Sequence, residues 1–190
     1  SKTRRKQGLL DSSTEPSLVI DGNRFWFKQG ILHRTNGPAI ESLEGERIWC
    51  RNGKVFREDD KPAITNSNNK FWAPLVGESY SKKSHELFDI WFENQQIHRE
   101  NNPAVVSKQG IKKWFKKGSL HREDGPAAEY PDGSLIWFQN GLCHRGNGPA
   151  EIRPKVNANE SWYRLGEIHT DNGPARITPK GMIRYKNGQL

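Results

Sequence analysis

The chain has 190 residues, a formal net charge of +8 at pH 7 and a hydrophobic content of only 33%. No apolar stretch approaches the roughly 18 residues that a membrane-spanning helix needs, which argues against membrane insertion, and seven Trp and eight Phe are too many aromatic residues for a disordered chain. The sequence shows no signal-peptide pattern, and two cysteines do not make a disulfide framework, so a cytoplasmic protein is expected.

Residues 1–17 are polar and basic, and the sequence predicts that they form a flexible basic tail. A repeat of about 23 residues follows and occupies residues 18–190. Its last copy stops just after the turn and has Arg184 where the other copies have Trp. Degenerate terminal copies are typical of capped repeat arrays, so residues 18–190 are expected to form one array.

A tryptophan marks each copy of the repeat. The seven tryptophans are Trp26, Trp49, Trp72, Trp91, Trp114, Trp137 and Trp162. Seven residues after most of them stands a histidine, or Phe56 in one copy, and an arginine usually follows. Pro-Ala comes twelve residues after most tryptophans, which gives the consensus W-[FY]-x-N-G-x-x-H-R-x-x-G-P-A. About six copies agree, so the pattern predicts tandem structural units.

Each copy is expected to be a β-hairpin. Asn52-Gly53 and Asn140-Gly141 predict two-residue turns, because both residues of such a pair tolerate positive φ. The turn then pairs the aromatic residue after Trp with the aliphatic residue before His, as in Phe27 with Leu32, and this apolar face is expected to form the shared core. The predicted fold is therefore all-β, with about six 23-residue hairpin units in an elongated twisted sheet or solenoid.

The face that carries Trp and His also carries charged side chains. Residues two positions before and after Trp lie on it, so this face or its margin is expected to meet water. Rings interleaved with cations can stack on bases and hold phosphates. Packing of each Trp on the Pro-Ala of a neighbouring unit is favoured for the rings, and the basic run from Ser107 to Arg122 is the better binding candidate. The candidates for partner binding are Arg24, Trp26, Lys28, Arg47, Arg51, Lys112, Lys113, Lys116 and Lys117.

An extra segment at residues 73–89 interrupts the period after Trp72. Its Pro, Gly and Ser residues predict an inserted loop, and long loops inside a compact array are often functional. A tolerated insertion explains the segment equally well. Tyr80, Lys82 and Lys83 in this loop complete the set of partner-binding candidates.

No catalytic, cofactor or metal site is predicted. The histidines suggest a metal site, but Phe56 at their position cannot ligate and favours packing beside Trp, and the sequence has no closely spaced Cys/His cluster. The run from His121 to Asp124 resembles a kinase catalytic loop, yet no Gly-rich phosphate loop accompanies it. Cys50 and Cys143 occupy core positions and are expected to be small buried hydrophobes. The chain is therefore not expected to be an enzyme.

The W-[FY]-x-N-G pieces, Trp49 to Gly53 and Trp137 to Gly141, resemble MORN-type repeats. They are most similar to the bacterial variant in which an aromatic-aromatic-x-Asn-Gly hairpin recurs every twenty-odd residues, and some proteins with that variant are described as antitoxins. The His-Arg-x-x-Gly-Pro-Ala half is similar to repeat arrays of phage and giant-virus proteins. The resemblance covers residues 18–190 and implies a sheet of hairpins used as a binding platform. MORN units lack His-Arg and Gly-Pro-Ala, so the lipid binding linked to them is not expected here.

Three functional hypotheses remain. The first is a non-catalytic scaffold that binds a macromolecular partner, most of all a protein with an acidic surface, as a phage- or mobile-element-encoded inhibitor or antitoxin-like factor in the cytoplasm of a bacterial or virus-infected cell. The second is nucleic-acid binding by a basic, aromatic-studded sheet face, with affinity that falls steeply with salt. The third and least favoured is an enzyme that uses the repeated histidines. Those histidines are His33, His98, His121, His144 and His169.

Overall fold

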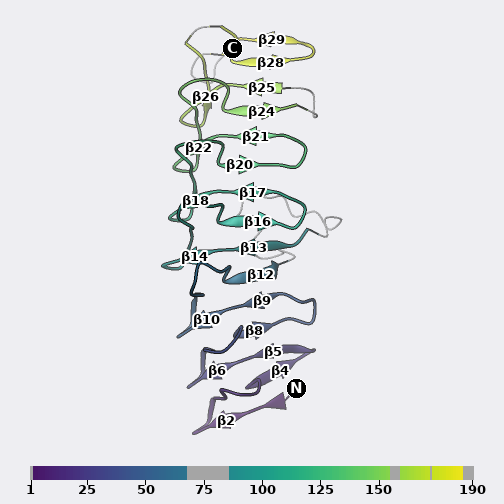
Figure 1. The fold of residues 1–190 in the computed structure, drawn as a ribbon, viewed down its shortest axis with the longest axis vertical. Helices are drawn as coiled ribbons and strands as arrows, with labels where there is room; N and C mark the ends of the chain where they lie inside the picture. Colours follow the sequence, from purple (N-terminus) through teal and green to yellow (C-terminus); the bar gives the residue numbers. More distant parts are fainter. Residues whose placement is uncertain (1, 68–85, 155–158, 172, 186–190) are drawn as a thin grey trace. The chain divides into compact units, whose positions relative to one another are not determined.

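The computed structural model describes residues 2–67, 86–154, 159–171 and 173–185. The chain divides into two compact units, Ser1–Ile97 and His98–Leu190. The described residues are all-β and contain no helix (Figure 1). They therefore include no helix with the length and hydrophobicity that crossing a membrane requires. The predicted class of tandem β-hairpins is confirmed.

In the first unit, the described sheet strands pair in chain order and are antiparallel. They are β1 (Lys2–Thr3), β4 (Leu18–Ile20), β5 (Asn23–Phe25), β8 (Ile40–Glu41), β9 (Arg47–Ile48), β12 (Ile64–Ser67) and β13 (Phe88–Ile90). Two-stranded hairpins stand between them. They are β2–β3 (Arg5–Lys6, Leu9–Leu10), β6–β7 (Phe27–Lys28, Ile31–Leu32), β10–β11 (Cys50–Arg51, Lys54–Val55) and β14–β15 (Phe92–Glu93, Gln96–Ile97).

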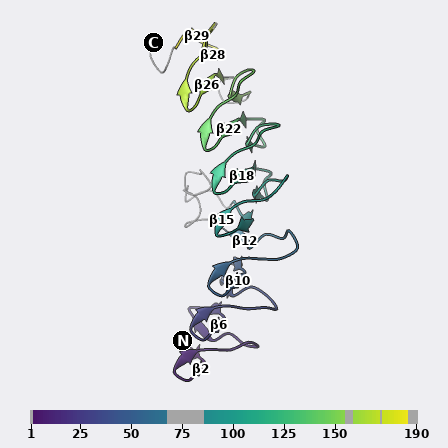
Figure 2. The same ribbon diagram turned by 90° about the vertical axis from the view of Figure 1, so that its left-hand side faces the viewer.

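The second unit follows the same plan. Its sheet strands are β16 (Val105–Ser107), β17 (Lys112–Lys113), β20 (Ala128–Glu129), β21 (Leu135–Ile136), β24 (Glu151–Arg153), β25 (Asn159–Ser161), β28 (Arg176–Thr178) and β29 (Gly181–Ile183). Its hairpins are β18–β19 (Phe115–Lys116, Ser119–Leu120), β22–β23 (Phe138–Gln139, Leu142–Cys143) and β26–β27 (Tyr163–Arg164, Glu167–Ile168). Within each unit the sheet is a meander in which every second connection carries a hairpin, and successive hairpins follow one another along one side (Figure 2).

The predicted hairpin register is confirmed. The pairs are Phe27 with Leu32, Cys50 with Val55, Phe92 with Ile97, Phe115 with Leu120, Phe138 with Cys143 and Tyr163 with Ile168. The turns have the positive φ angles that Asn-Gly accommodates, 51° at Asn52 and 74° at Gly53. However, Cys50, Ile97 and Phe115 are buried whereas their counterparts in the other hairpins are mostly half-buried, so this face is only part of the core.

At every tryptophan that the structure describes, the chain leaves the large sheet and enters a hairpin, so the residues before and after Trp belong to different sheets. Trp26 lies between β5 of the large sheet and β6 of a hairpin. Its N–H donates to the Ala39 carbonyl at 2.9 Å, and its own carbonyl accepts the His33 N–H at 3.0 Å. Because these two partners lie in different segments, Trp is the corner at which the backbone passes from one sheet to the next.

The alanine of each Pro-Ala is almost completely buried in the core. The Ala39 carbonyl accepts the N–H of Trp26 in its own copy, and the Ala39 N–H donates to the Ile48 carbonyl at 2.8 Å. These alanines are buried in every copy. They are Ala39, Ala63, Ala104, Ala127, Ala150 and Ala175. The position therefore accepts only a small side chain, and its backbone N–H and carbonyl both form hydrogen bonds.

Residues 2–17, expected to be a flexible basic tail, form a further hairpin copy. Arg5 pairs with Leu10 across the turn, and Lys2 pairs with Val19 of β4. The Leu10 carbonyl accepts the Gly30 N–H at 2.8 Å, which joins this hairpin to the next. The segment lacks Trp and His, so the repeat pattern did not extend to it, but the backbone groups of β4 and the following turn still hold it.

One turn position predicts a stabilising substitution. Leu165 has a φ of 49° and a side chain that is 61% exposed, so it has left-handed backbone with no packing to compensate. Replacing Leu165 with Asn, which tolerates this backbone, is expected to raise the free energy of unfolding by about 0.5–1 kcal/mol. Urea unfolding followed by circular dichroism measures the change, and a destabilised Leu165→Asn protein would contradict it.

Candidate functional site

An arginine covers the ring of Trp in four copies of the repeat. The arginine stands eight residues after the Trp and its guanidinium lies over the indole face. The distances from guanidinium carbon to ring centroid are 3.7 Å for Arg34 on Trp26, 3.7 Å for Arg57 on Trp49, 4.0 Å for Arg122 on Trp114 and 3.9 Å for Arg145 on Trp137. A cation at this position is attracted by the ring quadrupole. The arginine thus belongs to the architecture of the copy.

The same guanidinium is anchored to the backbone. The Nη1 atom of each arginine donates to the carbonyl of the proline four or five residues later, at 3.1 Å for Arg34 to Pro38 and 3.3 Å for Arg122 to Pro126. Arg34 also pairs with Glu41 at 3.1 Å. Trp, Arg and Pro-Ala of one copy therefore form a closed set of contacts.

Four of the histidines join their hairpin to the next one. They are His33, His98, His121 and His144. The Nδ1 atom of His121 accepts the Asn140 N–H at 3.1 Å, and Nδ1 of His98 accepts the Lys117 N–H at the same distance. On the other side of the ring, Nε2 of His121 lies 3.4 Å from the Glu123 carboxylate. These rings hold the first turn residue of the following copy, a structural role that supports the packing interpretation. In the described ranges, no group of three or more His, Cys, Asp or Glu side chains is placed to hold a metal ion.

A groove opens between consecutive copies at four equivalent places. Each lies between the residues that follow Trp in one copy and the His-Arg segment of the copy before it, or Asp11 and Ser12, which stand in the place of His-Arg in the first copy. The grooves measure about 370 Å³ beside Phe27, 160 Å³ beside Trp49, 350 Å³ beside Trp114 and 430 Å³ beside Trp162. We call them the inter-repeat grooves. A larger hollow of about 760 Å³ lies between Lys2 and Arg24 but is not one of this series, and the repetition of the inter-repeat grooves makes them the candidate functional site.

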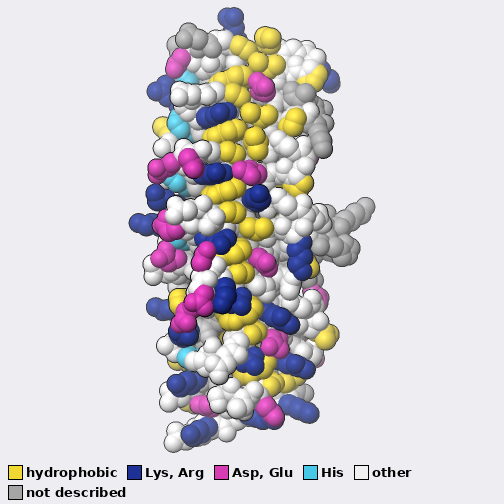
Figure 3. Space-filling view, in the orientation of Figure 1, with side chains coloured by type: hydrophobic (Ala, Val, Ile, Leu, Met, Phe, Trp, Pro, Cys, Tyr) yellow, Lys and Arg dark blue, Asp and Glu magenta, His cyan; other side chains and the backbone are white. Residues whose placement is uncertain are grey.

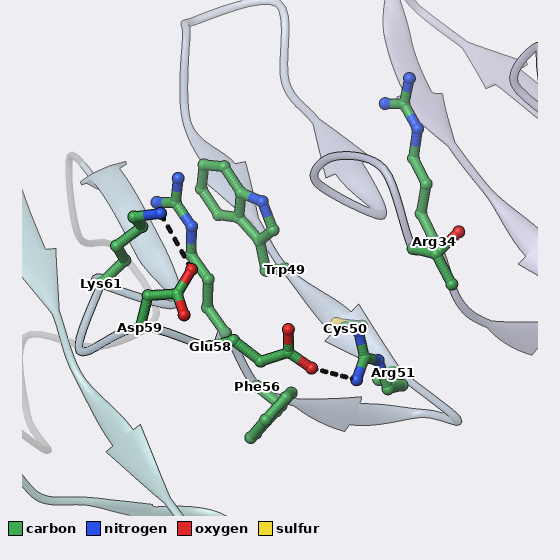
Figure 4. Close-up of a pocket in the computed structure, with 10 residues that line it drawn as sticks. Arg34, Trp49, Cys50, Arg51, Phe56, Glu58, Asp59 and Lys61 are labelled. Atoms are coloured by element: carbon green, nitrogen blue, oxygen red, sulfur yellow. Dashed lines mark hydrogen bonds and ion pairs between the residues drawn. The ribbon is translucent and has the colours of Figure 1, made fainter.

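The groove beside Trp49 shows how charges are arranged. Glu58 reaches Arg51 with an Oε1–Nη1 distance of 2.5 Å, and Lys61 pairs with Asp59 at 3.1 Å (Figure 4). Acidic and basic side chains therefore alternate along the rim. In each unit they border a band of hydrophobic side chains on the visible face (Figure 3).

The groove beside Trp114 has the same mixed rim. Lys116 pairs with Glu123 at 3.4 Å, and Asp124 pairs with Arg122 at 2.9 Å. Hydrogen bonds from His121 and Lys116 lower the pKa of Glu123, and one from Arg122 lowers the pKa of Asp124, so both carboxylates stay charged at neutral pH.

Most of the basic residues predicted to bind a partner are at the surface. Arg24, Lys28, Arg47, Lys112, Lys116 and Lys117 are exposed and Arg51 is half-buried. Trp26 and Lys113 were also predicted to bind a partner, but both are buried, with exposed fractions of 3% and 1%. Lys113 packs near Tyr130, with its Nζ 5.5 Å from the ring centroid, because it and Lys112 point to opposite faces of β17. Tyr80, Lys82, Lys83 and most of the predicted insert at 73–89 lie outside the described residues.

The exposed basic residues do not form one continuous basic patch. Arg24 pairs with Glu41 at 3.7 Å, and the Glu41 position pairs in register with Arg47 on the next strand. Lys112 lies directly opposite Glu129 on β20. Carboxylates thus separate the cations along the sheet, which reduces the positive potential that a polyanion would meet.

The two cysteines are packing residues. Cys50 is buried in β10 and Cys143 is half-buried in β23, as expected for small hydrophobes at core positions. Burial raises the pKa of Cys50 to about 11, and burial with the nearby Glu151 carboxylate raises that of Cys143 to about 12. Both thiols are therefore protonated at neutral pH and poorly nucleophilic.

The arginines that cover the Trp rings were not among the predicted site residues. The signal was present, because Arg stands eight residues after Trp in five copies and Thr170 replaces it in the sixth. Alternation along a strand could not assign it, since the bend at Trp brings residue eight back over the ring.

A double-mutant cycle tests the stacking. Trp114→Leu and Arg122→Gln are each expected to destabilise the protein, and their combined effect should fall short of the sum by about 0.5–2 kcal/mol, the energy of a partly desolvated cation–π pair. Urea unfolding of the four proteins gives the coupling energy. Strictly additive losses would show that the guanidinium and ring do not interact.

The comparisons with known proteins add no relative to this geometry: no protein-family model matches the chain, and no curated protein matches it.

Proposed function

We propose that this chain is a non-catalytic repeat scaffold that binds another protein through its inter-repeat grooves, acting as an inhibitor or antitoxin-like factor of phage or mobile-element origin. The histidines, stacked arginines and tryptophans that recur in the copies are engaged in holding the fold. The side chains that vary from groove to groove, such as Glu58, Glu123 and Asp171, face solvent at the rims. Repetition of a rigid surface with variable rims suits recognition of an extended protein surface.

The mixed charge of the groove rims is the observation that carries this proposal. Glu123 and Asp124 lie beside Lys116 and Arg122 in one groove, and Glu58 and Asp59 lie beside Arg51 and Lys61 in another. Carboxylates at these positions repel a phosphate backbone, whereas a protein surface can present a basic group to each acid and an acidic group to each base. Protein binding is therefore favoured over nucleic-acid binding, even though the net charge is +8.

Affinity purification from a lysate of the source organism tests the proposal, with and without nuclease treatment. We expect capture of a defined protein that survives nuclease, and a loss of about tenfold or more in capture when Glu123 is changed to Lys. Glu44→Lys is the matched control, because Glu44 is exposed in the turn between β8 and β9 and lines none of the inter-repeat grooves.

Three results would contradict it. Capture that disappears with nuclease and falls steeply with salt would favour nucleic-acid binding. Equal losses of capture in Glu123→Lys and Glu44→Lys would show that the partner does not bind at the grooves. An activity that is abolished by His121→Phe without loss of stability would favour an enzyme.

A further inference from the structure

The groove beside Trp162 lacks the arginine that fills the equivalent place elsewhere. Thr170 stands eight residues after Trp162, where Arg34, Arg57, Arg122 and Arg145 stand in their copies. Among the described residues, no Arg or Lys lies over the Trp162 ring, which is only half-buried. This groove is also the largest of the four inter-repeat grooves at about 430 Å³.

Two backbone hydrogen bonds of the filled copies recur at Trp162. The Trp162 N–H donates to the Ala175 carbonyl at 2.9 Å, and the His169 N–H donates to the Trp162 carbonyl at 3.0 Å. Pro174 precedes Ala175 and is therefore equivalent to the prolines whose carbonyls accept a guanidinium N–H from Arg34 and Arg145. A ring face and a proline carbonyl thus stand in the arrangement that binds a guanidinium in the copies of Trp26, Trp49, Trp114 and Trp137.

The charges around Trp162 are also compatible with a guanidinium. Arg164 pairs with Asp171 at 3.7 Å, just as Lys116 pairs with Glu123 beside the stacked Arg122. The copy of Trp137 shows that stacking does not require a rim carboxylate. Gly146 stands there at the position that Glu123 has in the copy of Trp114, and Arg145 still stacks on the ring at 3.9 Å. Arg145 also lines the Trp162 groove, and it is engaged there with Trp137 and with the Pro149 carbonyl at 3.2 Å.

We infer that the Trp162 groove is a binding site for the guanidinium of an arginine side chain supplied by a partner protein. The guest arginine stacks on Trp162 and donates to the Pro174 carbonyl. It takes the place of the internal arginine of the other copies, because Thr170 is too short and carries no charge. This assignment rests on the proposed function for the source of the arginine. The chemistry of the site itself rests on the four internal arginines, which serve as the molecule's own examples of the ligand.

Nuclear magnetic resonance of the full chain tests the site with a small probe, Nα-acetyl-L-arginine methylamide. The Trp162 indole N–H signal, identified by its absence in Trp162→Phe, is expected to shift saturably with an affinity in the millimolar range. Thr170→Arg is expected to remove this response and to raise the melting temperature by about 1–4 °C, because an internal guanidinium then occupies the site. The Trp137 signal, whose ring is already covered by Arg145, is the internal control and should not shift.

The lysine analogue of the probe and adenosine monophosphate separate other ligand chemistries. Lysine lacks the planar fork, so a weaker shift is expected, and the nucleotide tests base stacking on the same ring. No saturable shift, a shift that persists in Thr170→Arg, an equal response to the lysine analogue, or a stronger response to the nucleotide would each overturn the inference. These results are distinct from failure of the proposed function, which is read from partner capture by the unmodified protein.

Discussion

Replacing Trp26 with alanine is expected to lower the free energy of unfolding by about 3–5 kcal/mol, as removal of a buried aromatic side chain does in other cores. Trp26 is 3% exposed, and one face of its ring carries the Arg34 guanidinium at 3.7 Å. Truncation leaves a cavity beside the corner of the backbone and removes the ring from a half-buried cation. Urea unfolding followed by circular dichroism measures the loss.

Trp26→Phe is the matched control for this substitution. The indole N–H of Trp26 is buried and finds no hydrogen-bond acceptor in the described part of the chain. Phenylalanine keeps a ring under Arg34 and removes that unpaired donor, so it should cost no more than about 1–2 kcal/mol. Equal losses for the two variants would mean that ring packing is not what holds this corner.

Enlarging the alanine of Pro-Ala is expected to have the next largest effect. Ala39→Leu should destabilise the protein by about 1–3 kcal/mol, because extra methylene groups in a filled core force neighbouring atoms apart. Ala39 is buried, and its N–H and carbonyl bond to Ile48 and Trp26 in different segments, so the backbone cannot move without loss of one of these hydrogen bonds.

The control adds a leucine where there is room. Lys54 is exposed in β11, and Lys54→Leu is expected to change the free energy of unfolding by no more than about 0.5 kcal/mol. If Ala39→Leu proved as mild as Lys54→Leu, the alanine position would have room for a larger side chain. Thermal unfolding of both variants under one set of conditions decides between the two outcomes.

The hairpins were predictable because turn chemistry is local. Asn52-Gly53 requires two successive positive φ angles, and a two-residue loop leaves one register for its strands, so Cys50 had to face Val55. Alternation then placed the apolar residues of each hairpin on one side. These inferences need only residues within a few positions of one another.

The bend at Trp and the role of the arginines were not predictable in this way. The hydrogen-bond partners of Trp26 are Ala39 and His33, thirteen and seven residues further on, and alternation assumes a strand that does not turn. Once the backbone turns, Arg34 lies over the ring that precedes it by eight residues. The site therefore depends on contacts whose geometry exists only in the folded copy.

Alternation along a strand also did not show which of its two faces is buried. Lys112 and Lys113 are chemically identical neighbours, yet strand alternation exposes one and buries the other. The N-terminal hairpin was missed for a different reason. Arg4 holds the place of Trp there and Asp11 that of His, and the copy is identified by its backbone: the Arg4 N–H donates to the Ser17 carbonyl, and the Asp11 N–H donates to the Arg4 carbonyl, as Trp and His do elsewhere.

Amide hydrogen exchange in the wild-type protein and in His121→Phe tests most directly the claim that the repeated residues hold the copies together. The Asn140 N–H donates to His121 Nδ1, whereas the neighbouring Gly141 N–H donates to the Leu120 carbonyl. We expect both amides to be protected in the wild type. His121→Phe should lower the protection of the Asn140 amide by about tenfold, because roughly one hydrogen bond is lost, while the Gly141 amide stays protected. An Asn140 amide that exchanges freely in the wild type, or at the same rate in both proteins, would contradict the claim.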